Sequence, residues 1–402
     1  MKIDEDYKRV KVKPAQLAYY DIKPETPVCK LQRKKFAPIS FRLEDVLPVV
    51  GMDAQYVRRV VGKKDNLYID DIYELIEQDA FQETFIPRSK VCDFLMSGGD
   101  RKNVLCCSKC LINQVVQGDA RDLIPLLPDQ SIQCVVTSTP YWAMRIYDQM
   151  IATHWSDGEV CAFGLEQTPE GFIRHSVEIL YCLFPKISNL GSIWWNIMDT
   201  YNTRTQIRSN AVEALRAMQG KDRRTWKDHK YKRYSGGHSF LKDGEQCMIP
   251  YRIAERASRI GYYVKSLISW CKSSSLPEPQ QSRVSRNVEY VIHLSKTRTP
   301  LFMKDKYLNT PPELGGRQNV ESEKLSDFWY LPTSAGRDGH GAQFPLQLPG
   351  RCIALTSKPC DLVLDPFAGA GTTLQAAKKL GRHYVGFEMS SQYVNLSKLR
   401  LS

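Results

Sequence analysis

The sequence lacks the segments that would carry a chain into or across a membrane. No apolar run approaches the roughly 20 residues that a spanning helix needs. The charged start, from Met1 to Asp6, shows no secretory signal. Its 12 cysteines follow no regular spacing, which is typical of reduced thiols rather than of a disulfide framework. These absences favour a cytoplasmic protein with no membrane partner.

Positive charge, by contrast, is in excess. Lysine and arginine number 56 against 44 aspartates and glutamates, which gives a formal net charge of +12 and an isoelectric point of about 9.0. This balance suits a polyanionic partner, although it says nothing about the fold. The length of 402 residues allows two or three domains with a substantial core.

The most informative motif is the tetrapeptide Ser138-Thr139-Pro140-Tyr141. It follows the apolar run 132–136, whose β-branched residues predict a buried parallel strand. Open α/β sheets bind ligands at the carboxyl ends of their strands, and the proline makes a rigid turn there. A hydroxyl, the carbonyl before the proline and an aromatic ring would share that edge. They suit a flat base with an exocyclic amine, because two acceptors can take its hydrogens while the ring stacks.

A second motif occupies residues 361–373. A short apolar strand ends at Asp365, Gly369 and Gly371 permit a tight turn, and a helix is predicted from Thr372 to Leu380. The next strand ends at Glu388, which completes an order that binds a nucleoside with the acid on the ribose. The third glycine of the dinucleotide fingerprint is missing, which disfavours NAD. Asp365 instead suits a cationic amino-acid group such as that of S-adenosylmethionine.

With these two motifs in this order, the chain resembles an amino-methylating DNA methyltransferase of the permuted, or beta, class. In that class the catalytic motif precedes the cofactor motif. The family's tetrad is Ser, Asn or Asp, then Pro, Pro, and Tyr or Phe, so the chain matches three of four places and has Thr139 where proline is usual. Residues 366–371, Pro-Phe-Ala-Gly-Ala-Gly, match the cofactor motif. The matches span residues 112–401.

The resemblance implies a role for each matched residue. The catalytic residues would be Ser138, Thr139, Pro140 and Tyr141. The cofactor, S-adenosylmethionine, would leave as S-adenosylhomocysteine and would contact Asp119, His340, Phe344, Pro345, Asp365, Pro366, Phe367, Gly369, Gly371, Thr372 and Glu388. Among these, Asp365 would bind the methionine amino group, Glu388 the ribose and Asp119 the adenine. A helix cap or a surface acid is the alternative for each of the three.

Periodicity predicts an α/β fold: a doubly wound, mostly parallel, Rossmann-like sheet with helices on both faces. Helices such as Pro169–Leu183 and Pro250–Arg259 separate seven expected strands, at 112–117, 132–136, 192–196, 264–270, 289–294, 362–364 and 384–387. The resemblance puts the last two strands in the middle of the sheet. We expect a catalytic domain over 106–402, with inserts at 200–247 and at 296–335, the latter for target recognition.

Residues 1–105 are predicted to form a helical accessory region that could contact DNA. Within it, Leu43 to Val61 fits a helix-turn-helix with Gly51 in the turn, although an ordinary helical hairpin is the favoured interpretation. Residues 69–76 also have helical periodicity.

The first insert is basic and aromatic, which favours contact with nucleic acid over a solvated surface loop. Its seven cations are expected to bind DNA: Lys221, Arg223, Arg224, Lys227, Lys230, Lys232 and Arg233. Trp226, Tyr231 and Tyr234 alternate with them. The basic stretches at 272–275 and 283–286 are expected near the same rim.

The cysteines predict no metal site. Cys106, Cys107 and Cys110 contain a Cys-x-x-Cys, but a structural zinc usually needs a second pair, and none has matching spacing. Methylation of a cytosine carbon would need a Pro-Cys at the base site, whereas Pro140 is followed by Tyr141.

The predicted reaction is methyl transfer to an exocyclic amine of a flipped base in double-stranded DNA. Cytosine N4 is favoured because a leading serine, here Ser138, is commoner in the cytosine-N4 enzymes of the resembling family. Adenine N6, an RNA substrate and a catalytically inactive methyltransferase-fold subunit for DNA recognition are the alternatives. A cognate restriction endonuclease could act in the same system without forming a stable complex.

Overall fold

A computed structural model describes most of the chain from residue 111 onward and part of the N-terminal region. The described residues are 40–50, 54–68, 71, 111–142, 152–155, 160–166, 168–202, 205–207, 232–234, 241–242, 244–272, 282–333 and 344–402. In this part of the chain, no helix has the length and apolar character needed to cross a bilayer.

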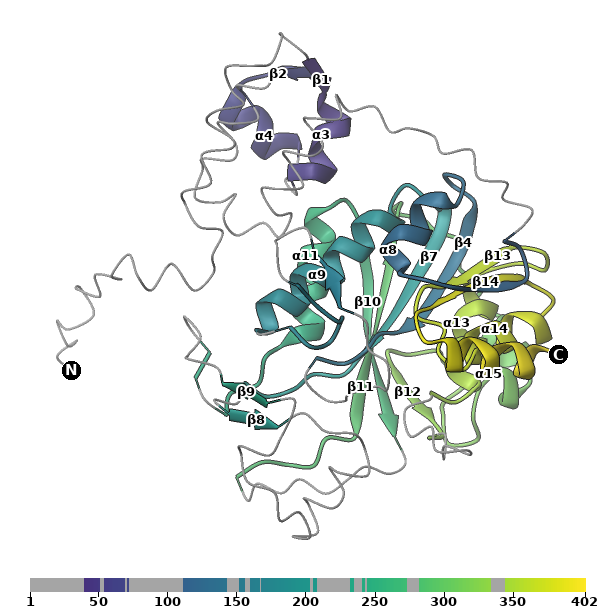
Figure 1. Cartoon of the computed structure of the whole chain (residues 1–402). Helices are drawn as coiled ribbons and strands as arrows, with labels where there is room; N and C mark the ends of the chain where they lie inside the picture. Colours follow the sequence, from purple (N-terminus) through teal and green to yellow (C-terminus); the bar gives the residue numbers. More distant parts are fainter. Residues whose placement is uncertain are drawn as a thin grey trace.

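The centre of the molecule is an eight-stranded sheet (Figure 1). Its strands are β3 (Gln114–Gln117), β4 (Ile132–Ser138), β7 (Ile187–Ile197), β10 (Tyr263–Lys272), β11 (Val288–Ser295), β12 (Phe328–Leu331), β13 (Leu362–Asp365) and β14 (His383–Glu388). Their order is β12-β10-β11-β7-β4-β13-β14-β3. Seven strands run in one direction, and only β11 is antiparallel to its neighbours. The predicted mostly parallel sheet is confirmed.

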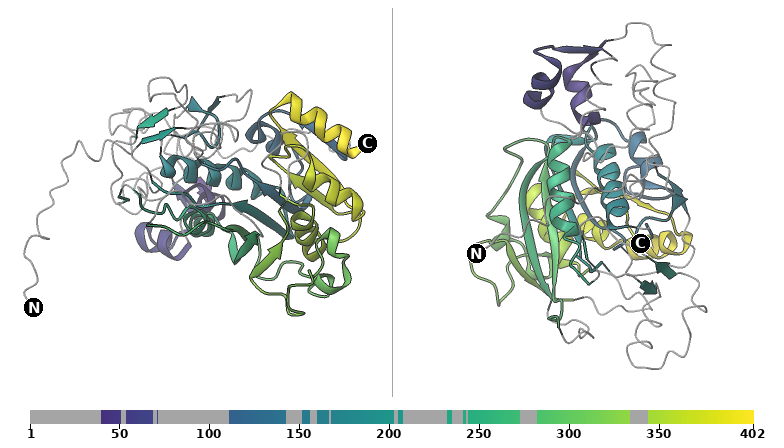
Figure 2. Two further views of the ribbon diagram at one scale, coloured as in Figure 1. Left: turned by 90° about the horizontal axis from the view of Figure 1, so that it is seen from below. Right: turned by 90° about the vertical axis from the view of Figure 1, so that its left-hand side faces the viewer.

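Helices cover both faces of this sheet (Figure 2), so the doubly wound prediction is also confirmed. One core contains residues of α9 (Pro169–Leu183) and α11 (Ile249–Arg259), and the other those of α13 (Gln347–Thr356), α14 (Thr372–Lys379) and α15 (Ser391–Leu401). Successive strand residues alternate between the two cores. Trp195 lies in the first and Trp194 in the second, as the two-residue period of a strand requires.

All seven predicted strands are present, mostly with longer bounds. The sequence did not anticipate β12, which lies inside the predicted insert 296–335 and adds to the sheet edge beside β10. In an apolar run of four residues, periodicity cannot distinguish a strand from a helix. Pairing with β10 is what makes this segment a strand. The same segment contains α12 (Lys306–Asn309) and the 3-10 turn η6 (Pro312–Leu314).

The last two strands of the chain lie inside the sheet, as predicted. β13 pairs with β4 and β14 pairs with β3, all in parallel. Because parallel strands end at the same edge, residues near position 138 and residues near position 365 meet although more than half of the chain separates them. This insertion positions the two motifs of the sequence beside each other.

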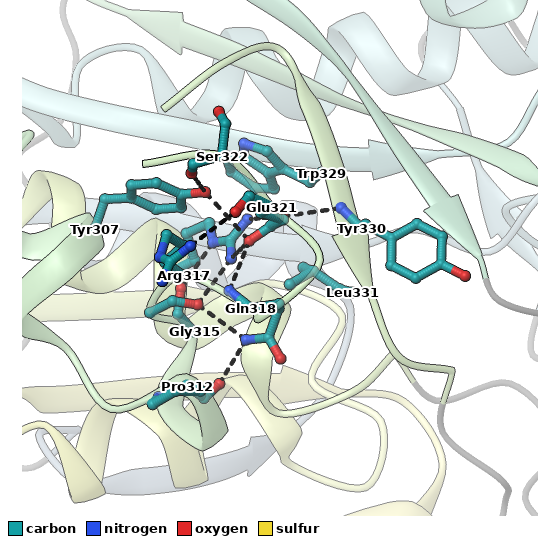
Figure 3. A network of polar contacts seen from close by, with 12 residues as sticks. Tyr307, Pro312, Gly315, Arg317, Gln318, Glu321, Ser322, Trp329, Tyr330 and Leu331 are labelled. Carbon is teal, nitrogen blue, oxygen red and sulfur yellow. Dashed lines mark hydrogen bonds and ion pairs between the residues drawn. The ribbon is translucent and has the colours of Figure 1, made fainter. Parts of the chain in front are cut away.

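The segment 306–331 contains a network of polar contacts (Figure 3), and a buried ion pair between Glu321 and Arg351 anchors this segment to α13. The Arg351 side chain is fully buried, and its nitrogens lie 2.7 and 2.8 Å from the carboxylate oxygens of Glu321. It also donates to the carbonyls of Gly315 and Gly316 and lies 5.1 Å from the ring centres of Tyr307 and Trp329. Burial raises the pKa of Glu321, but the hydrogen bonds and charge of Arg351 outweigh burial and lower it.

The described N-terminal residues form two helices and a small strand pair. Strand β1 (Ser40–Arg42) leads into α3 (Leu43–Val50), α4 (Ala54–Val61) follows, and β2 (Asn66–Tyr68) pairs with β1. Two helices were expected here. Gly51 and most of 69–76 lie outside the described residues, so the helix-turn-helix hypothesis stays a prediction. The remaining short elements are α8 (Ala120–Leu123), η4 (Ile124–Leu126), β5 (Thr153–His154), β6 (Val160–Cys161), β8 (Thr205–Ile207) and β9 (Lys232–Tyr234).

Candidate active site

The predicted site residues gather at the carboxyl edge of the parallel strands. Ser138 ends β4, Asp365 ends β13 and Glu388 ends β14, while Asp119 follows β3. These four strands are neighbours in the sheet. The edge is therefore acidic on the side of β13, β14 and β3, where a ligand with a positive charge would be favoured.

Asp365 has the largest pKa shift among the acidic side chains of this edge. Its side chain is buried, and it accepts hydrogen bonds from the Thr137 hydroxyl at 2.7 Å and the Phe367 amide at 3.0 Å. Burial raises the pKa of Asp365 to about 6, although these bonds and one from Thr373 oppose the rise. A cation bound here would offset the burial, so the carboxylate fits the amino group of an amino-acid ligand.

The glycine turn is held by Glu388. One carboxylate oxygen accepts the Gly369 amide at 2.9 Å, and the other accepts the Ser390 amide at 2.9 Å. Gly369 has a φ of +51° and open space where a side chain would begin, whereas a side chain at Gly371, with a φ of +83°, would meet Ser397 of α15. A side chain at Gly369 would therefore point into open space, whereas Gly371 allows the turn to pack closely against α15. Burial raises the pKa of Glu388.

The flanking residues of the second motif pack into the structure. The Phe367 ring lies 5.3 Å from the ring of Phe163 and 6.2 Å from that of Trp195. Thr372 begins α14, and its hydroxyl accepts a hydrogen bond from Arg400. The residues Pro366 to Gly371 link the end of β13 to this helix.

Asp119 acts as the N-cap of α8. One carboxylate oxygen accepts the Arg121 amide at 2.9 Å and the other accepts the Thr153 hydroxyl at 2.8 Å. The capping alternative is thus realised, and contact with an adenine stays a prediction. Phe344 and Pro345 lie just before α13, with Phe344 packed against the second core. His340 lies outside the described residues.

The tetrapeptide joins the site through side chains that the sequence did not single out. The Ser138 hydroxyl lies 3.2 Å from the Tyr141 hydroxyl, which donates to Glu289 of β11. Asn196 of β7 contacts the Ser138, Tyr141 and Glu289 oxygens at 3.3, 2.8 and 2.9 Å. The signal that could have found them is a polar side chain within an otherwise apolar strand. Thr139 is buried, and its hydroxyl has no partner among the described residues.

A family model described as DNA methylase, N6_N4_Mtase, matches residues 132–399. The chain belongs to this family. It is therefore a DNA methyltransferase of the N6/N4 class, and its cofactor is S-adenosylmethionine. The model spans both motifs of the edge, from β4 to α15.

Several known proteins are similar to this chain. The type II methyltransferase M.XycI of Xanthomonas campestris pv. cyanopsidis is 30% identical over 285 residues, which cover 71% of this chain and 86% of that protein. M.SmaI of Serratia marcescens is 27% identical over 72% of this chain and 90% of its own length. Among solved structures, the PvuII DNA methyltransferase (cytosine-N4-specific) superposes with a TM-score of 0.49 at 20% identity, over 71% of this chain and 85% of that one.

The predicted DNA-binding cluster of this methyltransferase falls mostly outside the described residues. Of its seven cations, only Lys232 and Arg233 belong to a described strand, β9, whose side chains are not described. The basic stretch 283–286 is described and lies at the rim: Arg286 donates to the Asp199 carbonyl just after β7, and the guanidinium groups of Arg283 and Arg286 lie over the Tyr201 ring. Cys106, Cys107 and Cys110 are outside the described residues.

Proposed function

We propose that this methyltransferase transfers a methyl group to cytosine N4 in double-stranded DNA, at a specific sequence. The observation that carries the proposal is the pair of consecutive residues at the end of β4. Thr137 bonds Asp365 of the cofactor motif, while the next residue, Ser138, begins the catalytic tetrad. The leading serine is the feature that favours cytosine N4 over adenine N6.

The residues of the acidic edge fit the cofactor. Asp365 would hold the methionine amino group, Glu388 the ribose and Asp119 the adenine. The remaining contacts would come from His340, Phe344, Pro345, Pro366, Phe367, Gly369, Gly371 and Thr372. When bound, S-adenosylmethionine supplies an activated sulfonium methyl group, so alignment and electrostatics account for most of the catalysis.

The tetrad would receive the base. An exocyclic amine is a poor nucleophile because its lone pair is delocalised into the ring. Ser138 Oγ and the Thr139 carbonyl before Pro140 would accept the two amine hydrogens and favour a geometry nearer to sp³. Tyr141 would stack on the base, which must leave the duplex to reach this edge.

The domain plan belongs to the same proposal. Residues 1–105 would be an accessory region, and 106–402 the catalytic domain. The insert 200–247 would contact DNA phosphates, and 296–335 would take part in target recognition. A restriction endonuclease of the same system would recognise the same sequence without a stable complex.

The test is to incubate the protein with radiolabelled S-adenosylmethionine and mixed-sequence duplex DNA, then digest the DNA and separate the nucleosides. We expect label in N4-methylcytosine, and loss of that label in Ser138→Ala. Ser131→Ala is the matched control, because Ser131 precedes the other end of the same strand and bonds only the Pro128 carbonyl among the described contacts.

Other outcomes would replace parts of the proposal. Label in N6-methyladenine would keep the mechanism and change the base. Transfer to RNA but not to DNA would change the substrate. Absence of cofactor binding in calorimetry would favour the inactive DNA-recognition subunit.

A further inference from the structure

The four polar side chains around Ser138 come from four different parts of the sheet. Tyr141 follows β4, Asn196 lies in β7, Glu289 in β11 and Lys272 at the end of β10. Asn196 and Glu289 are 1% and 8% exposed. Polar groups buried to this degree cost free energy unless they are hydrogen-bonded. Here the Asn196 amide nitrogen donates to Glu289, while Asn196 Oδ1 has no partner among the described residues.

The charge of Glu289 is balanced by Lys272. The Lys272 ammonium lies 3.0 Å from one carboxylate oxygen of Glu289. The other oxygen accepts from the Tyr141 hydroxyl and from the Asn196 amide. Such a carboxylate can accept hydrogen bonds but has no hydrogen to donate.

This restriction sets the direction of every hydroxyl in the chain of bonds. Because Glu289 only accepts, the single hydroxyl hydrogen of Tyr141 points to Glu289. The Tyr141 oxygen is then an acceptor, so the Ser138 hydroxyl donates to it. Asn196 has two amide hydrogens, and its shorter contacts are to Tyr141 and Glu289, at 2.8 and 2.9 Å, rather than to Ser138, at 3.3 Å. Ser138 Oγ therefore keeps a lone pair for a donor from outside the protein.

We propose that Glu289 is a positioning residue for methyl transfer: through Tyr141 it turns the Ser138 hydroxyl so that the serine oxygen accepts a hydrogen of the target amine. The inference rests on the proposed function of Ser138, and applies equally to the amine of cytosine or of adenine. A neutral amide at position 289 would lose this directionality. Its oxygen would face Lys272, its NH₂ would face the tyrosine hydroxyl, and that hydroxyl could then donate to Ser138.

The experiment compares Glu289→Gln, Glu289→Asp and wild type in single-turnover methyl transfer with saturating cofactor and DNA. We expect Glu289→Gln to lower the rate about 10- to 100-fold, the range of a lost hydrogen bond to a charged group. Calorimetric affinity for S-adenosylmethionine should stay within about twofold. Glu289→Asp, which restores the carboxylate, should recover part of the rate. Glu170→Gln is the control, since Glu170 is a buried glutamate that pairs with Arg252 and Arg256 of α11 instead.

A double-mutant cycle separates positioning from a purely structural role. Tyr141→Phe removes the hydroxyl that transmits the effect, so adding it to Glu289→Gln should cost far less than it costs alone. Additive losses, or a Glu289→Gln rate equal to wild type, would overturn the inference while wild-type transfer continued. Absence of transfer by the wild type itself would instead refute the proposed function, and the inference with it.

Discussion

The raised pKa of Asp365 predicts that the proposed cofactor site lowers the stability of the cofactor-free protein. This carboxyl has an ordinary pKa of 3.8 and one of about 6 in the folded chain. A difference of about two pKa units corresponds to about 3 kcal/mol. The free energy of unfolding is therefore highest below pH 4, where Asp365 is protonated in both the folded and the unfolded chain. It falls as the pH rises from about 4 through 6, because only the folded chain resists ionisation of this carboxyl. Above that pH the fold contains a buried carboxylate whose hydrogen bonds only partly offset the cost of its burial.

Asp365→Asn should therefore stabilise the cofactor-free protein while abolishing tight cofactor binding. The amide oxygen can still accept from Thr137 and Phe367, so these two contacts persist. We expect urea denaturation at pH 8 to give a free energy of unfolding up to about 3 kcal/mol above wild type, and about half that gain at pH 5. Wild-type affinity for S-adenosylmethionine should fall up to about tenfold per pH unit below 6.

The matched control for this experiment is Asp361→Asn. Asp361 precedes the other end of the same strand, where its carboxylate accepts the Lys358 amide at 2.7 Å. It should change neither the pH dependence of stability nor cofactor affinity. A cofactor-free Asp365→Asn protein that is less stable than wild type at pH 8, or whose advantage is the same at pH 5 and pH 8, would refute the reasoning.

Three further changes test other contacts. Arg351→Met leaves Glu321 buried without its cation and should lower the free energy of unfolding by about 3–5 kcal/mol in urea denaturation. Gly164→Ala adds a side chain 3.1 Å from Pro140 of the proposed catalytic turn, at a φ of +91°, so methyl transfer should slow about tenfold or more while cofactor affinity is kept. Thr137→Val removes a hydrogen bond to ionised Asp365 and should raise the pKa of this carboxyl further. As the pH is lowered, calorimetry should therefore find that the variant loses cofactor binding at a higher pH than the wild type does.

Sequence alone located most of the strands and both motifs because their signals are local. An apolar strand that ends at Ser138, and a glycine turn between a strand and a helix, are patterns of a few adjacent residues. The helix Pro169–Leu183 was predicted with its observed bounds, since Thr168 caps it and Pro169 is its first residue. Such features depend on neighbours along the chain.

Tertiary structure alone decided which distant side chains meet. The bond from Thr137 to Asp365 joins residues 228 positions apart, and the network from Ser138 to Glu289 exists because β7 lies between β4 and β11 in the sheet order. β12 likewise became a strand only by pairing with β10. Composition and periodicity report the conformation of a segment, whereas the direction of the Ser138 hydroxyl depends on charges that other strands bring beside it.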